Sequence, residues 1–291
     1  MGTLIAMAYP TKLFANQADH TYVKCGTGGK AWGCWGGKTG GTELRRGTGS
    51  TKRANCIAKP NEKAGIKCYL INGVCHQAAN RILLPAGITV RGARGYSISE
   101  ALFGTYGRVG IWPCKSPFDK CASTTGDLPE CTEAALSARA AKAAPLRALS
   151  SGDKLDWHYI NGVLQIYDEA TPMIKSQATT AAQASAFHLK LFMYMAEFHL
   201  GPMLDKTLAK RLKQVRNDTE KARLKIEKPF AVNEAGAADF VEAFDRLTLD
   251  FQDEMANAMT AEQYLTLFDL KPDERVVLTD RNIVAKVFKL K

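Results

Sequence analysis

The second half of the chain has the clearest pattern of apolar and polar positions. From Lys154 onward, apolar side chains recur every three or four residues, which is the spacing of helices with one buried face. Proline residues interrupt this pattern at positions that suit helix starts and ends. The predicted helices cover about 154–168, 171–200, 202–228, 234–258 and 260–268, and Val276–Leu278 predicts a short strand.

The helix predicted over 202–228 has a regular apolar seam. Its members, separated alternately by four and three residues, are Leu208, Leu212, Val215, Thr219, Ala222 and Ile226. This heptad spacing predicts that the helix packs lengthwise on another long helix. We expect its charged residues to form a solvated face.

The first half has shorter and more varied patterns. β-branched and aromatic residues predict a strand over 19–25, a Gly-rich turn, and a returning strand over 30–35. We expect residues 1–18 to be irregular, with a short helix near Tyr9–Phe14. Residues 42–70 are expected to be loop-rich, with short strands near 56–58 and 66–70. Further on, a strand is predicted over 87–91 and a helix over 96–103, capped by Ser97 or Ser99.

The segment that begins at Cys75 combines a helix pattern with a reactive side chain. Ala78, Ala79, Ile82 and Leu83 form the apolar face of a helix of eight or nine residues, which Pro85 ends. Cys75 therefore lies at the first helical turn, where free N–H groups and the helix dipole favour a thiolate. The alternative is a buried structural Cys or half of a disulfide.

Composition changes sharply near the middle of the chain. All eight Cys and a net charge of +10 fall within residues 1–131, whereas residues 132–291 have equal numbers of acidic and basic side chains. We therefore predict an α+β fold with a Cys-rich, basic domain at 1–131, a linker helix at 132–153 and an all-helical domain at 154–291. The Ala-rich run from Glu133 to Leu149 supports the linker helix.

Eight Cys in so short a region predict disulfides or a metal site. The chain contains no C-x2-C pair, so zinc is disfavoured, and we predict neither a metal nor a cofactor. Cys114 and Cys121 enclose a short Pro-containing loop and form the best candidate bridge. Bridges from Cys25 to Cys34 and from Cys56 to Cys68 are also possible, since pairing cannot be deduced from sequence.

The apolar runs of the chain are too short for a membrane span of about 20 residues. The N-terminus has neither the basic start nor the long apolar segment of a signal peptide. Disulfides nevertheless suggest work outside the cytoplasm. We therefore expect cytoplasmic synthesis, followed by secretion or delivery through another route.

His20 is the preferred partner for Cys75. It begins a predicted strand, which would hold its side chain firmly enough to act as a base. His76 follows Cys75 directly on a helix and would point roughly 100° away from it. We therefore expect His76 to pack in the core or to contact substrate. The competing interpretation of His20 is an ordinary histidine at a strand end.

A strand that carries His and precedes a helix that opens with Cys resembles the circularly permuted papain-like hydrolases. This group includes permuted NlpC-type cell-wall peptidases and lecithin–retinol acyltransferases. The resemblance covers roughly residues 15–110, through the strand at 19–23 and the helix segment at 74–80. It implies a papain-like sheet domain in which Cys75 attacks an amide or ester carbonyl and His20 accepts the thiol proton. No residue clearly matches the third catalytic member of the family, although Glu43 is conceivable.

The leading hypothesis is a cysteine amidase or peptidase that acts on bacterial cell wall as a delivered antibacterial effector. Trp32, Trp35, His76 and Gln77 are the expected substrate contacts, and an immunity or delivery protein is an expected partner. The alternatives are an acyltransferase or lipase of the same fold, and a non-catalytic, disulfide-stapled module that binds an anionic polymer. The third alternative rests on a basic patch made of Arg45, Arg46, Lys52, Arg53, Lys59, Lys63 and Lys67.

Overall fold

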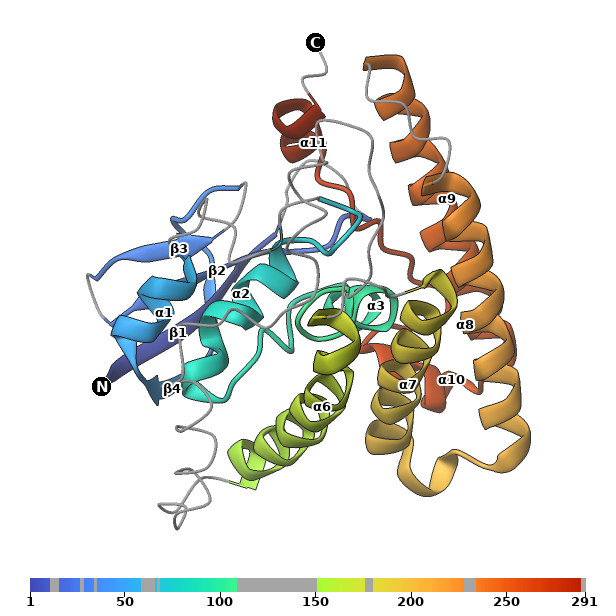
Figure 1. Ribbon diagram of the computed structural model, residues 1–291, viewed down its shortest axis with the longest axis horizontal. Helices are drawn as coiled ribbons and strands as arrows, with labels where there is room; N and C mark the ends of the chain where they lie inside the picture. Colours follow the sequence, from blue (N-terminus) through green and yellow to red (C-terminus); the bar gives the residue numbers. More distant parts are fainter. Residues whose placement is uncertain are drawn as a thin grey trace.

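In the computed structural model, a small antiparallel sheet with two helices lies beside a group of long helices (Figure 1). Helix α3 lies between these two parts. The described chain therefore has an α+β fold, as the sequence predicts. The structure describes residues 1–10, 16–26, 29–33, 36–58, 66, 69–108, 151–175, 180–227 and 234–288.

The sheet has the strand order β3-β2-β1-β4, and each strand is antiparallel to its neighbours. Its strands are β1 (Gly2–Tyr9), β2 (His20–Cys25), β3 (Ala31–Gly33) and β4 (Thr42–Gly49). The prediction of irregular structure before residue 18 is wrong, because Gly2–Tyr9 is a central strand. Both faces of β1 are covered, so the successive residues Leu4, Ile5 and Ala6 are all buried. The sequence of such a strand does not alternate between apolar and polar residues.

The hairpin predicted around the first Gly-rich turn is confirmed. β2 pairs with the shorter β3, with Val23 opposite Trp32. The prediction for 42–58 is wrong, because this segment forms β4 and then helix α1 (Thr51–Ala58) rather than loops. β4 pairs with β1 and is largely exposed or half-buried, so its sequence lacks a strong strand pattern.

Helix α2 (Cys75–Leu83) packs with α1 against one face of the sheet. The apolar face predicted for this helix is confirmed, because Ala78, Ala79, Ile82 and Leu83 are fully buried. These side chains meet inward-facing residues of β1 and β2, among them Leu4, Ala6 and Val23. A short 3-10 turn, η2 (Leu84–Ala86), contains Pro85 and ends the helix. The sheet therefore holds the start of α2 in a fixed position.

The chain after η2 departs from the predicted strand. Residues 87–91 form no strand. Helix α3 (Tyr96–Phe103) forms where it is expected, but its N-cap is Gly95 and no side chain caps it. Gly95 has a φ of 79°, and a Cβ there would lie 2.7 Å from Cβ of Ala18. Close packing and a left-handed backbone therefore fix this helix start, rather than Ser97 or Ser99.

The helical part closely follows its predicted pattern. Its helices are α6 (Ser151–Lys175), α7 (Ala181–Leu200), α8 (Lys206–Glu227), α9 (Glu234–Ala258), α10 (Ala261–Phe268) and α11 (Arg281–Phe288), with 3-10 turn η3 (Gly201–Met203) after α7. The single helix predicted over 171–200 is wrong. Its first residues extend α6 to Lys175, and a capping box between Thr180 and Gln183 starts α7. Val277 forms an isolated bridge with Gln17 rather than a longer strand.

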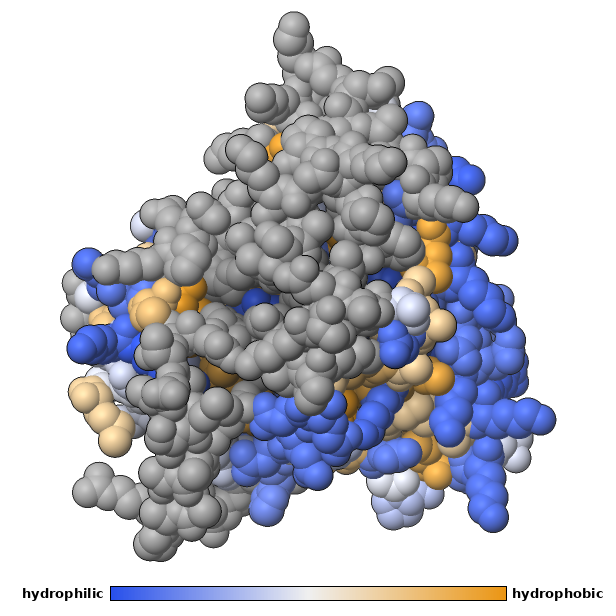
Figure 2. Space-filling view, viewed as in Figure 1, coloured by the Kyte–Doolittle hydropathy of each residue, from blue (hydrophilic) through white to orange (hydrophobic). Residues whose placement is uncertain are grey.

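The predicted lengthwise packing of α8 is confirmed, because α8 runs alongside α9 (Figure 1). Leu208 and Leu212 of the predicted seam are buried, whereas Val215 is half-buried. The outer side of these two helices is hydrophilic (Figure 2). The expectation that every charged residue of α8 is solvated is wrong, however, because the buried side continues through Arg216, Glu220 and Arg223.

Those buried charges belong to an ionic cluster that joins α8 to the sheet side of the molecule. The cluster consists of Arg108, Arg216, Glu220, Arg223 and Glu227, whose side chains are at most 5% exposed. Arg108 and Arg216 pair with Glu220, and Arg108 and Arg223 pair with Glu227. The main apolar core surrounds the cluster and combines residues of α3 with residues of α6 to α11.

Two Cys of the described chain are free thiols, namely Cys25 and Cys75. Cys56 is disulfide-bonded. The possible bridge from Cys25 to Cys34 is therefore not formed, because Cys25 is free. The Cys114–Cys121 bridge and residues 132–150 of the predicted linker helix lie outside the described residues, whereas residues 151–153 of the linker begin α6.

Candidate functional site

Cys75 is a reduced thiol at the first residue of α2, as the sequence predicts. Val74 before it has an extended backbone, and its N–H donates to Oε1 of Gln77, which fixes the helix start. The Cys75 thiol is 6% exposed and donates to the Asp19 carbonyl, with 3.9 Å between Sγ and the oxygen. Thr21 is a second neighbour of the thiol. Cys75 therefore contacts the residues on either side of His20.

The environment of Cys75 does not favour a resting thiolate. Burial raises the pKa of the thiol to about 11, and the negative charge of Asp280 adds to this. Thr21 and the His76 backbone lower the pKa but do not outweigh burial. The sequence prediction that the helix start would produce a low pKa is therefore wrong for this state, in which desolvation dominates.

His20 is the first residue of β2 and lies opposite Tyr9 of β1. The two rings are 4.9 Å apart between centroids. Gly36 covers the other side of the imidazole, because a Cβ there would lie 2.2 Å from Cε1. Glycine is thus required at position 36 for this ring to be accommodated. His20 is 1% exposed, and within the described chain neither ring nitrogen has a hydrogen-bond partner.

Among the described residues, no hydrogen bond of ordinary geometry engages the two ring nitrogens of His20, although the Gly37 backbone acts on the imidazole and raises its pKa. Burial lowers the pKa of His20 to about 4, although the charge of Asp280 acts in the opposite direction. The imidazole is therefore neutral at pH 7, and in this state burial opposes its protonation. A buried polar group without a partner costs about 1–3 kcal/mol, and such a cost often marks a functional residue.

The described structure brings Cys75 and His20 to the same stretch of β2 without a hydrogen bond between them. Strand alternation places Thr21 on the face toward α2 and His20 on the face shared by Tyr9 and Tyr22. The thiol and the ring thus flank the backbone at the start of the strand. Proton transfer between them requires a rearrangement of this strand end.

His76 and Gln77 are a correction to the expected substrate contacts, because both are fully buried and hydrogen-bonded. His76 does not point away from the neighbourhood of Cys75. Its Nε2 lies 2.9 Å from the Asp19 carbonyl and its Nδ1 lies 2.8 Å from Oγ of Ser99. Because a carbonyl only accepts, Nε2 carries the proton, and Nδ1 is the unprotonated nitrogen that faces the Ser99 hydroxyl. Gln77 donates to Ser99 and to the Gly104 carbonyl.

Asp280 is a residue of this site that sequence reasoning missed. The bridge between Gln17 and Val277 brings the C-terminal segment to β2, and Nε2 of Gln17 donates to the Thr279 carbonyl at 2.7 Å. Oδ1 of Asp280 accepts from the first N–H groups of α11, including that of Asn282. The only sequence signal at Asp280 is that of a helix cap, which gives no link to His20.

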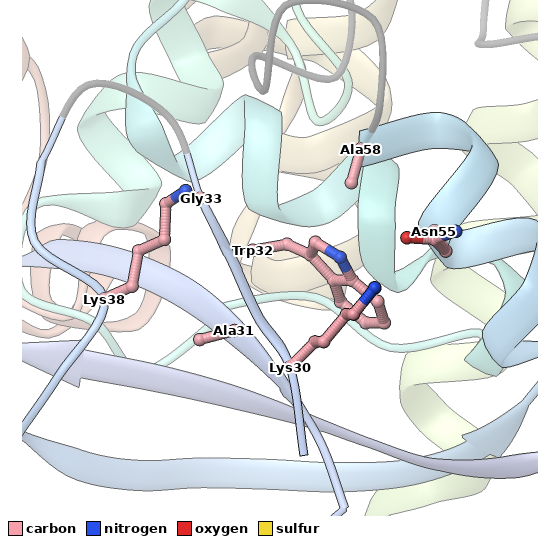
Figure 3. A pocket seen from close by; sticks show the side chains of 7 residues that line it. All are labelled: Lys30, Ala31, Trp32, Gly33, Lys38, Asn55 and Ala58. Carbon is pink, nitrogen blue, oxygen red and sulfur yellow. The ribbon is translucent and has the colours of Figure 1, made fainter.

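Trp32, an expected substrate contact, lines a pocket between β3 and α1 (Figure 3). Cys75 is not among the residues that line this pocket. Trp35, the other expected aromatic contact, lies outside the described residues.

The basic patch is partly used for structure. Arg45 pairs with Asp156 of α6 and donates to the Arg91 carbonyl, and Arg46 pairs with Glu43. Glu43 is thereby engaged with Arg46, which disfavours it as the third catalytic residue. Lys52 is exposed. Lys59, Lys63 and Lys67 lie outside the described residues.

Acid should destabilise the protein through His20 and His76. Burial lowers both pKa values from 6.5 to about 4, so folding excludes protons that the unfolded chain binds. The contribution of each to stability is fully present above pH 6.5 and is lost as pH falls toward 4. We expect a loss of roughly 2 kcal/mol per histidine between pH 7 and pH 4.5.

Urea unfolding at both pH values measures this effect. His20→Phe keeps an aromatic ring but removes the titrating group. Between pH 7 and pH 4.5 this variant should therefore lose less unfolding free energy than the wild type, by the contribution of one histidine. Equal losses in the variant and the wild type would show that His20 is not buried as a neutral group.

No group of His, Cys, Asp and Glu side chains in the described residues is arranged to hold a metal ion. Across the described helices, none combines the length and apolar character needed to span a membrane. Comparison with protein-family models, curated proteins and solved structures finds no match to this chain.

Proposed function

We propose that this protein is a cysteine hydrolase in which Cys75 is the nucleophile and His20 the general base. The observation that supports it best is the position of a reduced thiol at the start of α2, against the two neighbours of His20. The sheet packed on α2 agrees with a permuted papain-like arrangement. Within the described chain neither ring nitrogen of His20 makes a hydrogen bond, so the unprotonated nitrogen of the neutral ring is the proposed proton acceptor.

The reaction begins from a neutral thiol and a neutral imidazole. When substrate binds and the start of β2 rearranges, His20 takes the thiol proton and the Cys75 sulfur attacks the carbonyl carbon. The Cys75 backbone N–H, at the open end of α2, stabilises the oxyanion. His20 then gives its proton to the leaving group, and water releases the acyl group from sulfur.

Asp280 has opposite effects on the two reacting groups. Its negative charge favours protonated His20 and disfavours the Cys75 thiolate. The carboxylate therefore stabilises the imidazolium in the tetrahedral intermediate, where the sulfur is bonded to carbon and no longer carries a negative charge. This gives Asp280 an electrostatic role in place of the family's third residue.

The substrate class we propose is an amide in a cell-wall polymer, with the protein acting as a delivered antibacterial effector. The support is the resemblance to cell-wall peptidases, the excess of basic residues before position 132 and the presence of a disulfide at Cys56. An immunity or delivery protein belongs to the same proposal. Transfer of an acyl group to an acceptor other than water is the alternative within the fold.

The test is the covalent intermediate. Incubation with an activated ester, p-nitrophenyl acetate, should acetylate Cys75 and turn over, and peptide mapping by mass spectrometry should locate the adduct. Cys25, the other described free thiol, is the internal control and should remain unmodified. His20→Ala should slow adduct formation strongly. Modification of Cys25 alone, or equal rates in the His20 variant, would refute the dyad.

A further inference from the structure

A second feature of interest is the pocket of about 330 Å³ at the outer edge of the sheet (Figure 3). Its lining consists of Lys30, Ala31, Trp32, Gly33, Lys38, Asn55 and Ala58. The volume is near the lower end of the range for small-molecule sites. The space therefore suits a small ligand or one terminal unit of a polymer rather than a long chain segment.

The lining is rich in hydrogen-bond donors. Within the described chain, the side chains of Lys30, Trp32 and Asn55 have no hydrogen-bond or ionic partner. Figure 3 shows the Trp32 ring between β3 and α1, with Lys30 beside it and Asn55 on the facing helix. The described lining contains two lysines and no carboxylate. A ligand with negative charge and several oxygen atoms matches these groups.

Trp32 adds an apolar surface to this polar lining. The residue is half-buried and packs against the core formed by the sheet, α1 and α2, so its ring is held in place. A rigid indole face offers a stacking surface for the C–H groups of a sugar ring. The Asn55 amide both donates and accepts, which suits neighbouring hydroxyl groups.

The described lining lacks the groups that most often bind phosphate. Asn55 and Ala58 belong to the last turns of α1, so this helix presents no N-terminus to the pocket. Phosphate groups are commonly bound by helix N-termini or by the paired donors of Arg, and the described lining has neither. A single carboxylate beside Lys30 is a better match for this site.

We propose that this pocket binds a sugar unit that carries a carboxylate group. Trp32 stacks on the ring, Lys30 pairs with the carboxylate and Asn55 binds hydroxyl groups. The inference stands apart from the thiol chemistry, since it requires no reaction at Cys75. It also gives Trp32, which the sequence predicted as a substrate contact, a binding role in a pocket that Cys75 does not line.

Two-dimensional NMR of the indole N–H groups tests the proposal. The Trp32 signal, assigned through Trp32→Phe, should shift and saturate with tetragalacturonate and respond about fivefold more weakly to neutral maltotetraose. Lys30→Gln should weaken tetragalacturonate binding about fivefold. Lys210→Gln, which removes the same charge from the exposed side of α8, should leave binding unchanged.

Three results would overturn the inference. The first is an unmoved Trp32 signal at millimolar tetragalacturonate. The second is equal affinity for the acidic and the neutral sugar, or an equal effect of Lys30→Gln and Lys210→Gln. The third is tighter binding of inorganic phosphate than of the acidic sugar, which would make the pocket a phosphate site.

Discussion

Replacing Cys75 by Ala should reduce hydrolysis at least about a thousandfold, because the change removes the atom that forms the covalent bond. The nearest side chains cannot substitute for it. His76 donates its Nε2 proton to the Asp19 carbonyl, and its Nδ1 lies 2.8 Å from Oγ of Ser99. The measurement is turnover of a chromogenic ester and release of amines from purified cell wall.

The stability of the same variant distinguishes a nucleophile from a structural Cys. Cys75 is a free thiol, so Cys75→Ala should cost only about 1 kcal/mol of unfolding free energy. Loss of a disulfide would instead cost about 2–5 kcal/mol. Cys25→Ala is the matched control and should retain full activity. Full activity in Cys75→Ala with an unchanged melting temperature would remove the basis for the enzyme proposal.

Local signals predicted the elements nearest to the candidate site well. The apolar spacing of α2 gave its bounds and its buried face, because a short amphipathic helix on a sheet has a 3.6-residue period. β2 was predictable from its β-branched and aromatic residues. The position of Cys75 at a helix start followed directly from these two elements.

Strands without alternation were not predictable in this way. β1 is apolar throughout because helices cover one face and a second small core covers the other. β4 is basic and Gly-containing because much of it is exposed or half-buried at the sheet edge. In both strands the pattern reflects the surroundings, which a single sequence does not contain.

Contacts between distant parts of the chain explain the remaining differences. Asp280 reaches the neighbourhood of His20 because residues 277–280 bond to Gln17 and Tyr69, which are distant in the sequence. The low-pKa thiolate was expected from the dipole of α2, yet burial of Cys75 by the sheet has the larger effect. Arg216 and Arg223 were expected to be solvated, but both donate hydrogen bonds to carbonyl groups of α3. The sequence of α8 alone contains no sign of these partners.

The contacts of Arg223 explain why the chain keeps an arginine in its core. Its Nη1 donates to the Leu102 carbonyl, and its Nη2 donates to the carbonyls of Leu70 and Ile71. Leu102 lies in the last turn of α3, where carbonyls lack partners within the helix. Nε of Arg223 binds Glu227 at 2.6 Å, and the guanidinium stacks 4.5 Å from the Phe103 ring centre.

Arg223→Ala should destabilise the fold by about 3–5 kcal/mol, because it leaves Glu227 and several carbonyl oxygens buried with fewer donors. Arg108 still pairs with Glu227, so the carboxylate keeps one partner. Lys221→Ala is the matched control, because Lys221 is exposed on the same helix and pairs with Asp218. An exposed pair contributes at most about 1 kcal/mol.

Urea unfolding of the two variants decides whether the cluster holds the two parts of the molecule together. A loss of the expected size in Arg223→Ala, with one cooperative transition, supports this role. Arg223→Met retains the apolar contact with Phe103 but not the donors, so it should recover only part of the loss. Equal stabilities of Arg223→Ala and Lys221→Ala would show that the hydrogen bonds from Arg223 to the carbonyls of Leu70, Ile71 and Leu102 contribute little to the stability of the fold.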